Sequence, residues 1–128
     1  MGPTVQVFVG RKDSSQANPE GLIPNPRSPG EELVKLFQEK GISPTELTAL
    51  IGAHTASKQF VFDPSTAGTP LDSTVGIWDV KFYQQVLQKN APFILPSDMQ
   101  LSKTASTGGA FKAFAESQGK WSAAFSPA

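Results

Sequence analysis

The residue in this sequence best suited to metal chemistry is its single histidine, His54. Leu47, Leu50 and Ile51 precede it at helical spacing, which predicts that His54 lies on the apolar side of a helix, near the end of that helix. Burial favours neutral imidazole, the form that binds iron, and a ligating imidazole needs a partner for its second ring nitrogen, for which Asp98 is a candidate. A lone histidine on an apolar helix face is more often packed in a core or an interface. The residues alone therefore leave both interpretations open.

A second candidate site consists of oxygen-bearing side chains. Thr55 follows the histidine directly, and Asp72, Thr74 and Asp79 lie in the loop-forming segment 70–79. Two carboxylates and two hydroxyls, together with loop carbonyls, suit calcium, a hard cation that takes about six to eight oxygen ligands. The spacing is not that of an EF-hand, and aspartates in such positions also cap turns and helices. The residues therefore allow either a calcium site or ordinary turn capping.

Composition excludes several other kinds of chemistry. The chain has 128 residues and no cysteine, so disulfides, thiolate catalysis and cysteine metal sites are excluded. One histidine leaves little room for a conventional zinc site, and neither a Gly-x-Ser-x-Gly elbow nor a phosphate-binding loop is present. The 11 basic and 11 acidic residues balance, which indicates neither nucleic acid nor an anionic membrane as partner. No apolar stretch approaches membrane-spanning length, and residues 1–4 lack the basic region and apolar run of a signal peptide.

Helical periodicity dominates the chain and predicts an all-α fold, mainly helical with long loops, in one domain of residues 1–128. The clearest helix start is at Ser43, where a proline at the first helical position and a glutamate three residues after the cap complete a capping box. We also expect an extended run at residues 5–9 and loops at residues 10–30 and 58–78, which are rich in Pro, Gly, Ser or Thr. The predicted helices cover residues 31–40, 43 to about 54, 79–89, a short segment from 97, and 110–125.

Several separate motifs resemble, in order, one half of a known enzyme family. Residues 47–55 (LTALIGAHT) are similar to the proximal-histidine signature of the plant-type haem peroxidase superfamily. Residues 71–79, followed by Phe82 and Tyr83, resemble the next segment of class II fungal secretory peroxidases, the lignin- and manganese-peroxidase group. Further matches, which extend the resemblance over nearly the whole chain, lie in residues 9–13 (VGRKD), 21–26 (GLIPNP), 97–98 (SD) and 120–125 (KWSAAF).

The resemblance implies the proximal domain of the haem peroxidase fold, with haem b and calcium as cofactors. His54 would be the fifth ligand of the haem iron, and Asp98 would have the catalytic role of accepting the ring N–H of His54. The loop at residues 21–26 would lie near the haem edge, where family members admit small reducing substrates. The proximal calcium would be bound by Thr55, Asp72, Thr74, the carbonyl of Ile77, and Asp79.

The resemblance also identifies departures from the family. Its distal arginine, aromatic residue and histidine, which act on peroxide, should precede this segment, but the chain has no second histidine, and Arg11 and Arg27 lie in segments unlike that motif. We therefore expect a chain without the distal half. The exposed tryptophan of some lignin-type members maps to Ala49, so long-range oxidation through this position is not expected. The connector between Asp79 and Asp98 is shorter than is typical, which could shift Asp98.

Two functions from different classes follow from these observations. The first is the haem-binding segment of a hydrogen-peroxide-dependent peroxidase that oxidises small phenolic-type donors, weakly active or inactive alone, in a family whose members are extracellular. The alternative is a peroxidase scaffold without haem that contacts other proteins or self-associates, because loss of half of a two-domain enzyme leaves an apolar face. For the first function the partners would be a peroxide and a small reductant, as substrates of the parent enzyme. For the alternative, the partner would be a second copy of the chain or a distal half. Haem content distinguishes the two functions.

Overall fold

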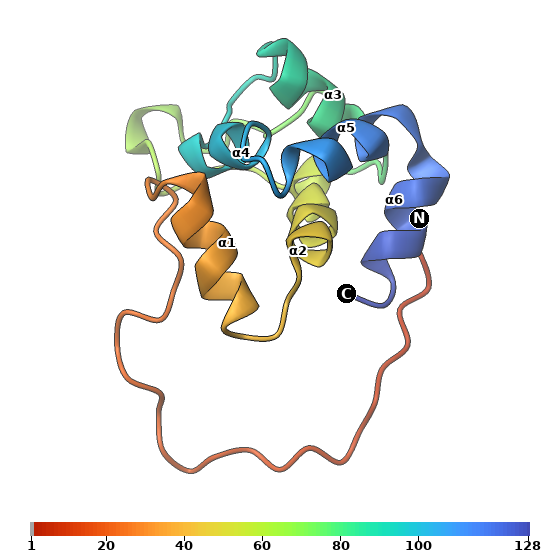
Figure 1. Ribbon diagram of the computed structural model, residues 1–128. Coiled ribbons are helices and arrows are strands. Elements are labelled where there is room, and N and C mark those ends of the chain that lie inside the picture. Colours follow the sequence, from red (N-terminus) through yellow and green to blue (C-terminus); the bar gives the residue numbers. More distant parts are fainter. Residues whose placement is uncertain (1) are drawn as a thin grey trace.

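Helices account for the regular secondary structure of residues 2–128, which the computed structural model describes (Figure 1). Within this range the only β-type pairing is an isolated bridge between Lys58 and Pro70, so the predicted all-α class is confirmed. None of the helices described there combines the length and the apolarity needed to cross a membrane. The α-helices are α1 (Gly30–Gln38), α2 (Pro44–Ile51), α3 (Lys81–Gln88), α4 (Pro96–Leu101), α5 (Gly108–Glu116) and α6 (Gln118–Phe125), with 3-10 helices η1 (Gly52–Ala56) and η2 (Pro64–Thr66).

Helix α2 begins where the sequence predicts. The Ser43 hydroxyl accepts the Glu46 N–H at 3.2 Å, and the Glu46 carboxylate accepts the Ser43 N–H at 2.7 Å, which completes the predicted capping box. Pro44 occupies the first helical position, and the Thr48 hydroxyl donates back to the Pro44 carbonyl at 2.7 Å. These local contacts determine where α2 begins and therefore which residues lie at its other end.

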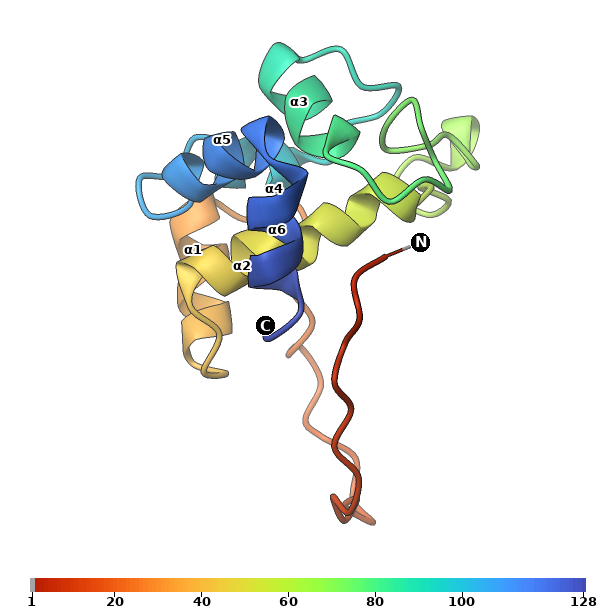
Figure 2. The same ribbon diagram turned by 90° about the vertical axis from the view of Figure 1, so that its right-hand side faces the viewer.

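Helix α2 is also the central element of the core (Figure 2). It contacts α1 on one side and both α5 and α6 on the other, and α3 packs on α5. Buried residues form two clusters. The smaller cluster joins α1, α2 and α4 and contains Leu33, Val34, Leu47 and Leu101. The larger cluster joins α2, α3, α5 and α6 and contains Ala49, Phe82, Tyr83, Val86, Phe111, Phe114, Ala115 and Trp121.

The last predicted helix is divided in two. Residues 110–125 were expected to form one helix, but Ser117 adopts an extended backbone conformation with φ −150° and ψ 107°, so that prediction is wrong. The Ser117 side chain accepts the Lys120 N–H at 3.3 Å and caps α6, because a serine oxygen competes with the helical backbone for hydrogen bonds. The break lets α6 turn back across α2 (Figure 2).

Residues 2–29 form an arm without helix or strand that leaves the helices and returns at α1 (Figures 1 and 2). The extended run predicted at residues 5–9 has no strand partner within residues 2–128. Its apolar side chains are exposed, with Val7, Phe8 and Val9 at 79%, 82% and 95% exposure. The arm therefore adds little to the core, although its last residues approach the helices beside His54.

We predict that a methyl group added at Gly52, the residue that follows α2, destabilises the fold. A β-carbon at Gly52 would overlap the Tyr83 hydroxyl and the Trp121 indole nitrogen. Gly52→Ala should lower the free energy of unfolding by about 1–3 kcal/mol, the usual cost of overpacking a core, as measured by urea unfolding. Gly109→Ala in α5 is the matched control, because nothing lies within 4 Å of the added carbon and alanine favours a helix. Equal destabilisation of both variants would contradict the prediction.

Candidate functional site

His54 lies just beyond the α-helical part of α2. The α-helix ends at Ile51, and the chain continues as the 3-10 helix η1, which contains His54. The imidazole borders the same apolar hollow as Leu47, Leu50 and Ile51, so His54 lies on the apolar side of α2, as predicted. The side chain is 29% exposed, so its burial there is partial.

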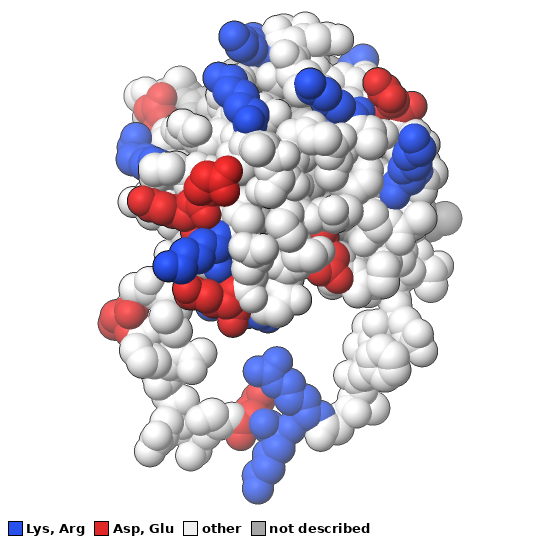
Figure 3. Space-filling model, in the orientation of Figure 1, with Lys and Arg blue, Asp and Glu red and all other residues white. Residues whose placement is uncertain are grey.

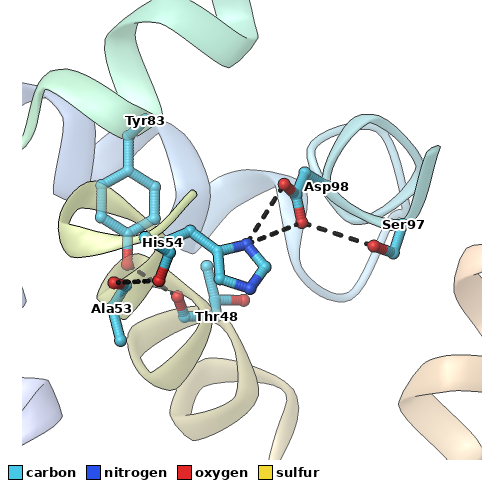
Figure 4. Close-up of polar contacts among 7 residues, drawn as sticks. Thr48, Ala53, His54, Tyr83, Ser97 and Asp98 are labelled. Atoms are coloured by element: carbon cyan, nitrogen blue, oxygen red, sulfur yellow. Dashed lines mark hydrogen bonds and ion pairs between the residues drawn. The ribbon is translucent and has the colours of Figure 1, made fainter. Parts of the chain in front are cut away.

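Two buried aromatic side chains hold the end of α2 in place. The Tyr83 hydroxyl lies 2.7 Å from the Thr48 carbonyl oxygen (Figure 4) and 3.3 Å from that of Ala49. The Trp121 indole N–H donates to the Ala49 carbonyl at 2.9 Å. Burial raises the pKa of Tyr83 well above its ordinary value, so the hydroxyl stays protonated as a donor. The sequence predicts both residues only as apolar core positions. A buried phenol or indole requires an acceptor, and that is the signal from which these contacts could have been inferred.

His54 faces Asp98 across the site (Figure 4). The Nδ1 atom of His54 lies 3.2 Å from both carboxylate oxygens of Asp98, which is fully buried in the first turn of α4. Phe82 packs edge-on against the imidazole, with ring centroids 5.5 Å apart. The short connector therefore does not separate His54 from Asp98. Because an ionised carboxylate only accepts hydrogen bonds, the neutral tautomer that fits this contact carries its hydrogen on Nδ1 and leaves the Nε2 lone pair for a ligand.

An apolar hollow of about 390 Å³ opens beside the imidazole. Side chains of α1 and α2, among them Leu33, Phe37 and Leu50, form much of its wall. Pro24 and Pro26 close another side, which puts part of the 21–26 loop next to His54. The residues around this hollow include no Asp, Glu, Lys or Arg, so it suits an apolar ligand.

A second hollow, of about 610 Å³, adjoins the first, and His54, Pro26 and Leu95 line both. We call it the loop hollow, because residues 57–62 form one wall. Two cationic side chains, Arg27 and Lys58, also line it, and the sequence analysis assigned no binding role to either.

The five predicted calcium ligands also lie together. Thr55 and Asp72 are fully buried, and Thr55 Oγ1 lies 2.5 Å from Asp72 Oδ2. The same hydroxyl oxygen is 3.4 Å from the Ile77 carbonyl oxygen and 3.5 Å from Asp79 Oδ1. Thr74 Oγ1 lies 3.1 Å from Asp79 Oδ1 and 3.5 Å from Asp72 Oδ1. We call this set the oxygen cluster, and it joins η1, next to His54, to the loop before α3.

The oxygen cluster contains more acceptors than hydrogens. Its two hydroxyls supply one hydrogen each, against two carboxylates and one carbonyl. In the part of the chain that the structure describes, no lysine or arginine nitrogen lies within 4.0 Å of either carboxylate. No group of three or more His, Cys, Asp or Glu side chains that could hold a metal occurs in residues 2–128. A metal in this cluster would therefore depend on hydroxyl and carbonyl oxygens, which is the ligand set of calcium rather than of zinc.

The same aspartates also act as caps, the other interpretation that the sequence allows. Asp72 Oδ1 accepts the Thr74 N–H and Asp79 Oδ1 accepts the Lys81 N–H just before α3, both at 2.9 Å. Capping accounts for one oxygen of each carboxylate. Capping does not explain why Thr55 and the two aspartates lie so close together. No positive charge in the described residues balances the two carboxylates there.

Known proteins similar to this chain are peroxidases. The peroxidase family model matches residues 1–117. Manganese peroxidase 3 of Phlebia radiata is 30% identical over 145 aligned positions, which cover 98% of this chain and 40% of that protein. Versatile peroxidase VPS1 of Pleurotus eryngii is 32% identical over 91 positions (71% of this chain and 25% of that protein). Putative L-ascorbate peroxidase 6 of Arabidopsis thaliana is 33% identical over 128 positions (94% and 36%). The chain thus spans two fifths or less of the length of these relatives.

We predict that Tyr83 ionises only when the chain unfolds. It is the only tyrosine, so tyrosinate absorbance in an alkaline titration reports this residue alone. Because burial raises its pKa, its contribution to stability is complete below the unfolded value of about 10 and is lost as pH rises above it. Tyrosinate absorbance and the loss of helical circular dichroism should therefore appear together. Tyrosinate formation near pH 10 with unchanged circular dichroism would show that the hydroxyl is not buried against α2.

Proposed function

Since this chain belongs to the peroxidase family, we propose that it forms the haem-binding segment of a hydrogen-peroxide-dependent peroxidase, with His54 as the proximal ligand of haem b iron. The observation that carries the proposal is the arrangement around the imidazole of His54. Its Nδ1 lies 3.2 Å from both oxygens of the buried Asp98, while the ring borders the apolar hollow. A neutral imidazole whose other nitrogen donates to a carboxylate is the form that ligates iron.

The residues of this chain would hold and orient the cofactor. Bound haem supplies the redox chemistry with peroxide and with the electron donor. Asp98 accepts the Nδ1–H of His54, which fixes the direction of the ring and increases the basicity of Nε2. Leu33, Phe37 and Leu50 would give the porphyrin an apolar wall in the neighbouring hollow. Tyr83 holds the end of α2 and therefore the position of His54.

We propose calcium as the ion of the oxygen cluster. Its two carboxylates, two hydroxyls and one carbonyl are all oxygen donors, and the excess of acceptors over hydrogens supports a cation there. The ion would tie Thr55, and with it the neighbouring His54, to the loop that precedes α3. Calcium would then have a positioning role and would not take part in the reaction.

The activity of the whole enzyme requires groups beyond these residues. Cleavage of peroxide needs a base and a positive charge near its oxygens, and the single histidine of this chain is engaged with Asp98. We therefore propose that this segment alone is weakly active or inactive, and that peroxide and a small phenolic-type donor are substrates of the larger enzyme. The resemblance to secreted fungal peroxidases supports an extracellular setting for that enzyme.

A scaffold without haem is the second candidate function, and the exposed apolar side chains favour it. Phe60 and Val61 beside the loop hollow are 60% and 89% exposed, in addition to Val7, Phe8 and Val9 in the arm. Apolar surface of this extent commonly marks contact with another polypeptide. A second copy of the chain, or a distal half, could supply that contact.

We predict that haemin binds to the purified chain and gives the Soret spectrum of a histidine-ligated haem. His54→Ala should abolish this spectrum, and Asp98→Asn should weaken haemin affinity by about tenfold or more, because it removes the charged partner of the ligand. The measurement is a haemin titration followed by absorbance, with circular dichroism as a check of folding.

Lys103→Ala is the control for this titration, because Lys103 is exposed and lies outside both hollows at His54. It should bind haemin like the unmodified chain. An identical spectrum in His54→Ala would contradict the ligand assignment. No haemin binding, combined with self-association in sedimentation velocity, would favour the scaffold function instead.

We predict that calcium stabilises the chain through the oxygen cluster. Added Ca²⁺ should raise the thermal midpoint, and Asp72→Asn should remove this response, because it removes one of two carboxylate ligands. Asp63→Asn is the matched control, since Asp63 caps Ser65 in an exposed loop outside the cluster. Loss of the response in both variants, or in neither, would contradict a calcium site at Asp72.

A further inference from the structure

The two hollows at His54 differ in charge, although they share one edge. The wall of the apolar hollow contains no lysine or arginine. The loop hollow contains Arg27 and Lys58, and no carboxylate lines either hollow. A ligand that extends over both hollows therefore meets apolar side chains at one end and two positive charges at the other.

Arg27 is held in place at the loop hollow. Its guanidinium carbon lies 4.3 Å from the ring centroid of Phe62, a cation–π contact that joins the end of the arm to the 57–62 segment. Phe62 in turn packs edge-on against Phe93 at 5.9 Å. The guanidinium is thus positioned without an acidic partner.

Lys58 lies four residues after His54, and its backbone pairs with Pro70 in the isolated bridge. Within residues 2–128 no carboxylate oxygen lies within 4.0 Å of the side-chain nitrogens of Arg27 or Lys58. Two cations that line one hollow without an acidic partner are suited to bind carboxylates, and arginine can do so with two parallel hydrogen bonds.

We propose that Arg27 and Lys58 bind the two carboxylates of an iron porphyrin and thereby set its in-plane orientation, an inference that rests on the proposed function. The carboxylate edge lies in the loop hollow and the apolar edge lies against Leu33, Phe37 and Leu50 in the apolar hollow. Orientation then follows from the separation of charge between the two hollows, while His54 determines the position of the iron.

The test compares porphyrins that differ only in their carboxylates. Iron protoporphyrin IX and its dimethyl ester are titrated into the chain by absorbance, and metal-free protoporphyrin IX and its dimethyl ester by fluorescence. The free acids should bind about three- to tenfold more tightly than the esters, the range expected for two partly solvated ion pairs. Added salt should reduce this preference.

The double variant Arg27→Gln/Lys58→Gln should lose the preference while its affinity for the esters stays unchanged. Arg27→Lys should keep most of it, because the charge remains. Lysine side chains also gather over α3 to α5 (Figure 3), and Lys103→Gln, at a separate hollow between α4 and α5, should have no effect.

Two results would overturn the inference. Equal binding of acid and ester by the unmodified chain would exclude a role for the carboxylates. Equal weakening of acid and ester in the double variant would show that Arg27 and Lys58 act through packing. The metal-free pair needs no iron ligand, so it tests the cationic edge even if His54→Ala leaves the haemin spectrum unchanged and the ligand assignment fails.

Discussion

The hydrogen bonds that Tyr83 and Trp121 donate to the carbonyls of Thr48 and Ala49 are the constraint on which the candidate site depends. Carbonyls near the end of a helix have few backbone partners, and here aromatic donors from α3 and α6 bind two of them in the core, in addition to the Gly52 N–H that donates to Ala49. The donors lie so close that only glycine fits at position 52, where the α-helix gives way to the 3-10 turn. The direction of His54 is thus a consequence of core packing.

The 3-10 turn lets two neighbouring residues take part in two different sites. Consecutive side chains of such a turn point about 120° apart, so His54 can face Asp98 while Thr55 enters the oxygen cluster. Because both residues belong to this one turn, the position of the imidazole is linked to the position of the loop before α3. In the proposed enzyme, loss of the ion would disturb the ligand without any direct contact between them.

Local chemistry could be predicted from the sequence, and features that depend on tertiary contacts could not. The start of α2 was predicted correctly because Ser43, Pro44 and Glu46 act within one turn. The 3-10 turn and the break at Ser117 were both missed because the apolar spacing continues through each of them. The proximity of His54 to Asp98, and of Thr55 to the two aspartates, was expected from the family resemblance and not from the spacing of those residues.

The stacking of Trp78 on Trp121 also has an optical consequence. These are the only two tryptophans of the chain, their ring centroids are 4.3 Å apart with an angle of 15° between the planes, and Trp121 contacts Tyr83 edge-on. Trp78 and Trp121, the two indole chromophores, therefore lie together where α6 crosses the end of α2. The indole bands of the near-ultraviolet circular dichroism and the tryptophan fluorescence thus monitor this one junction without any added label.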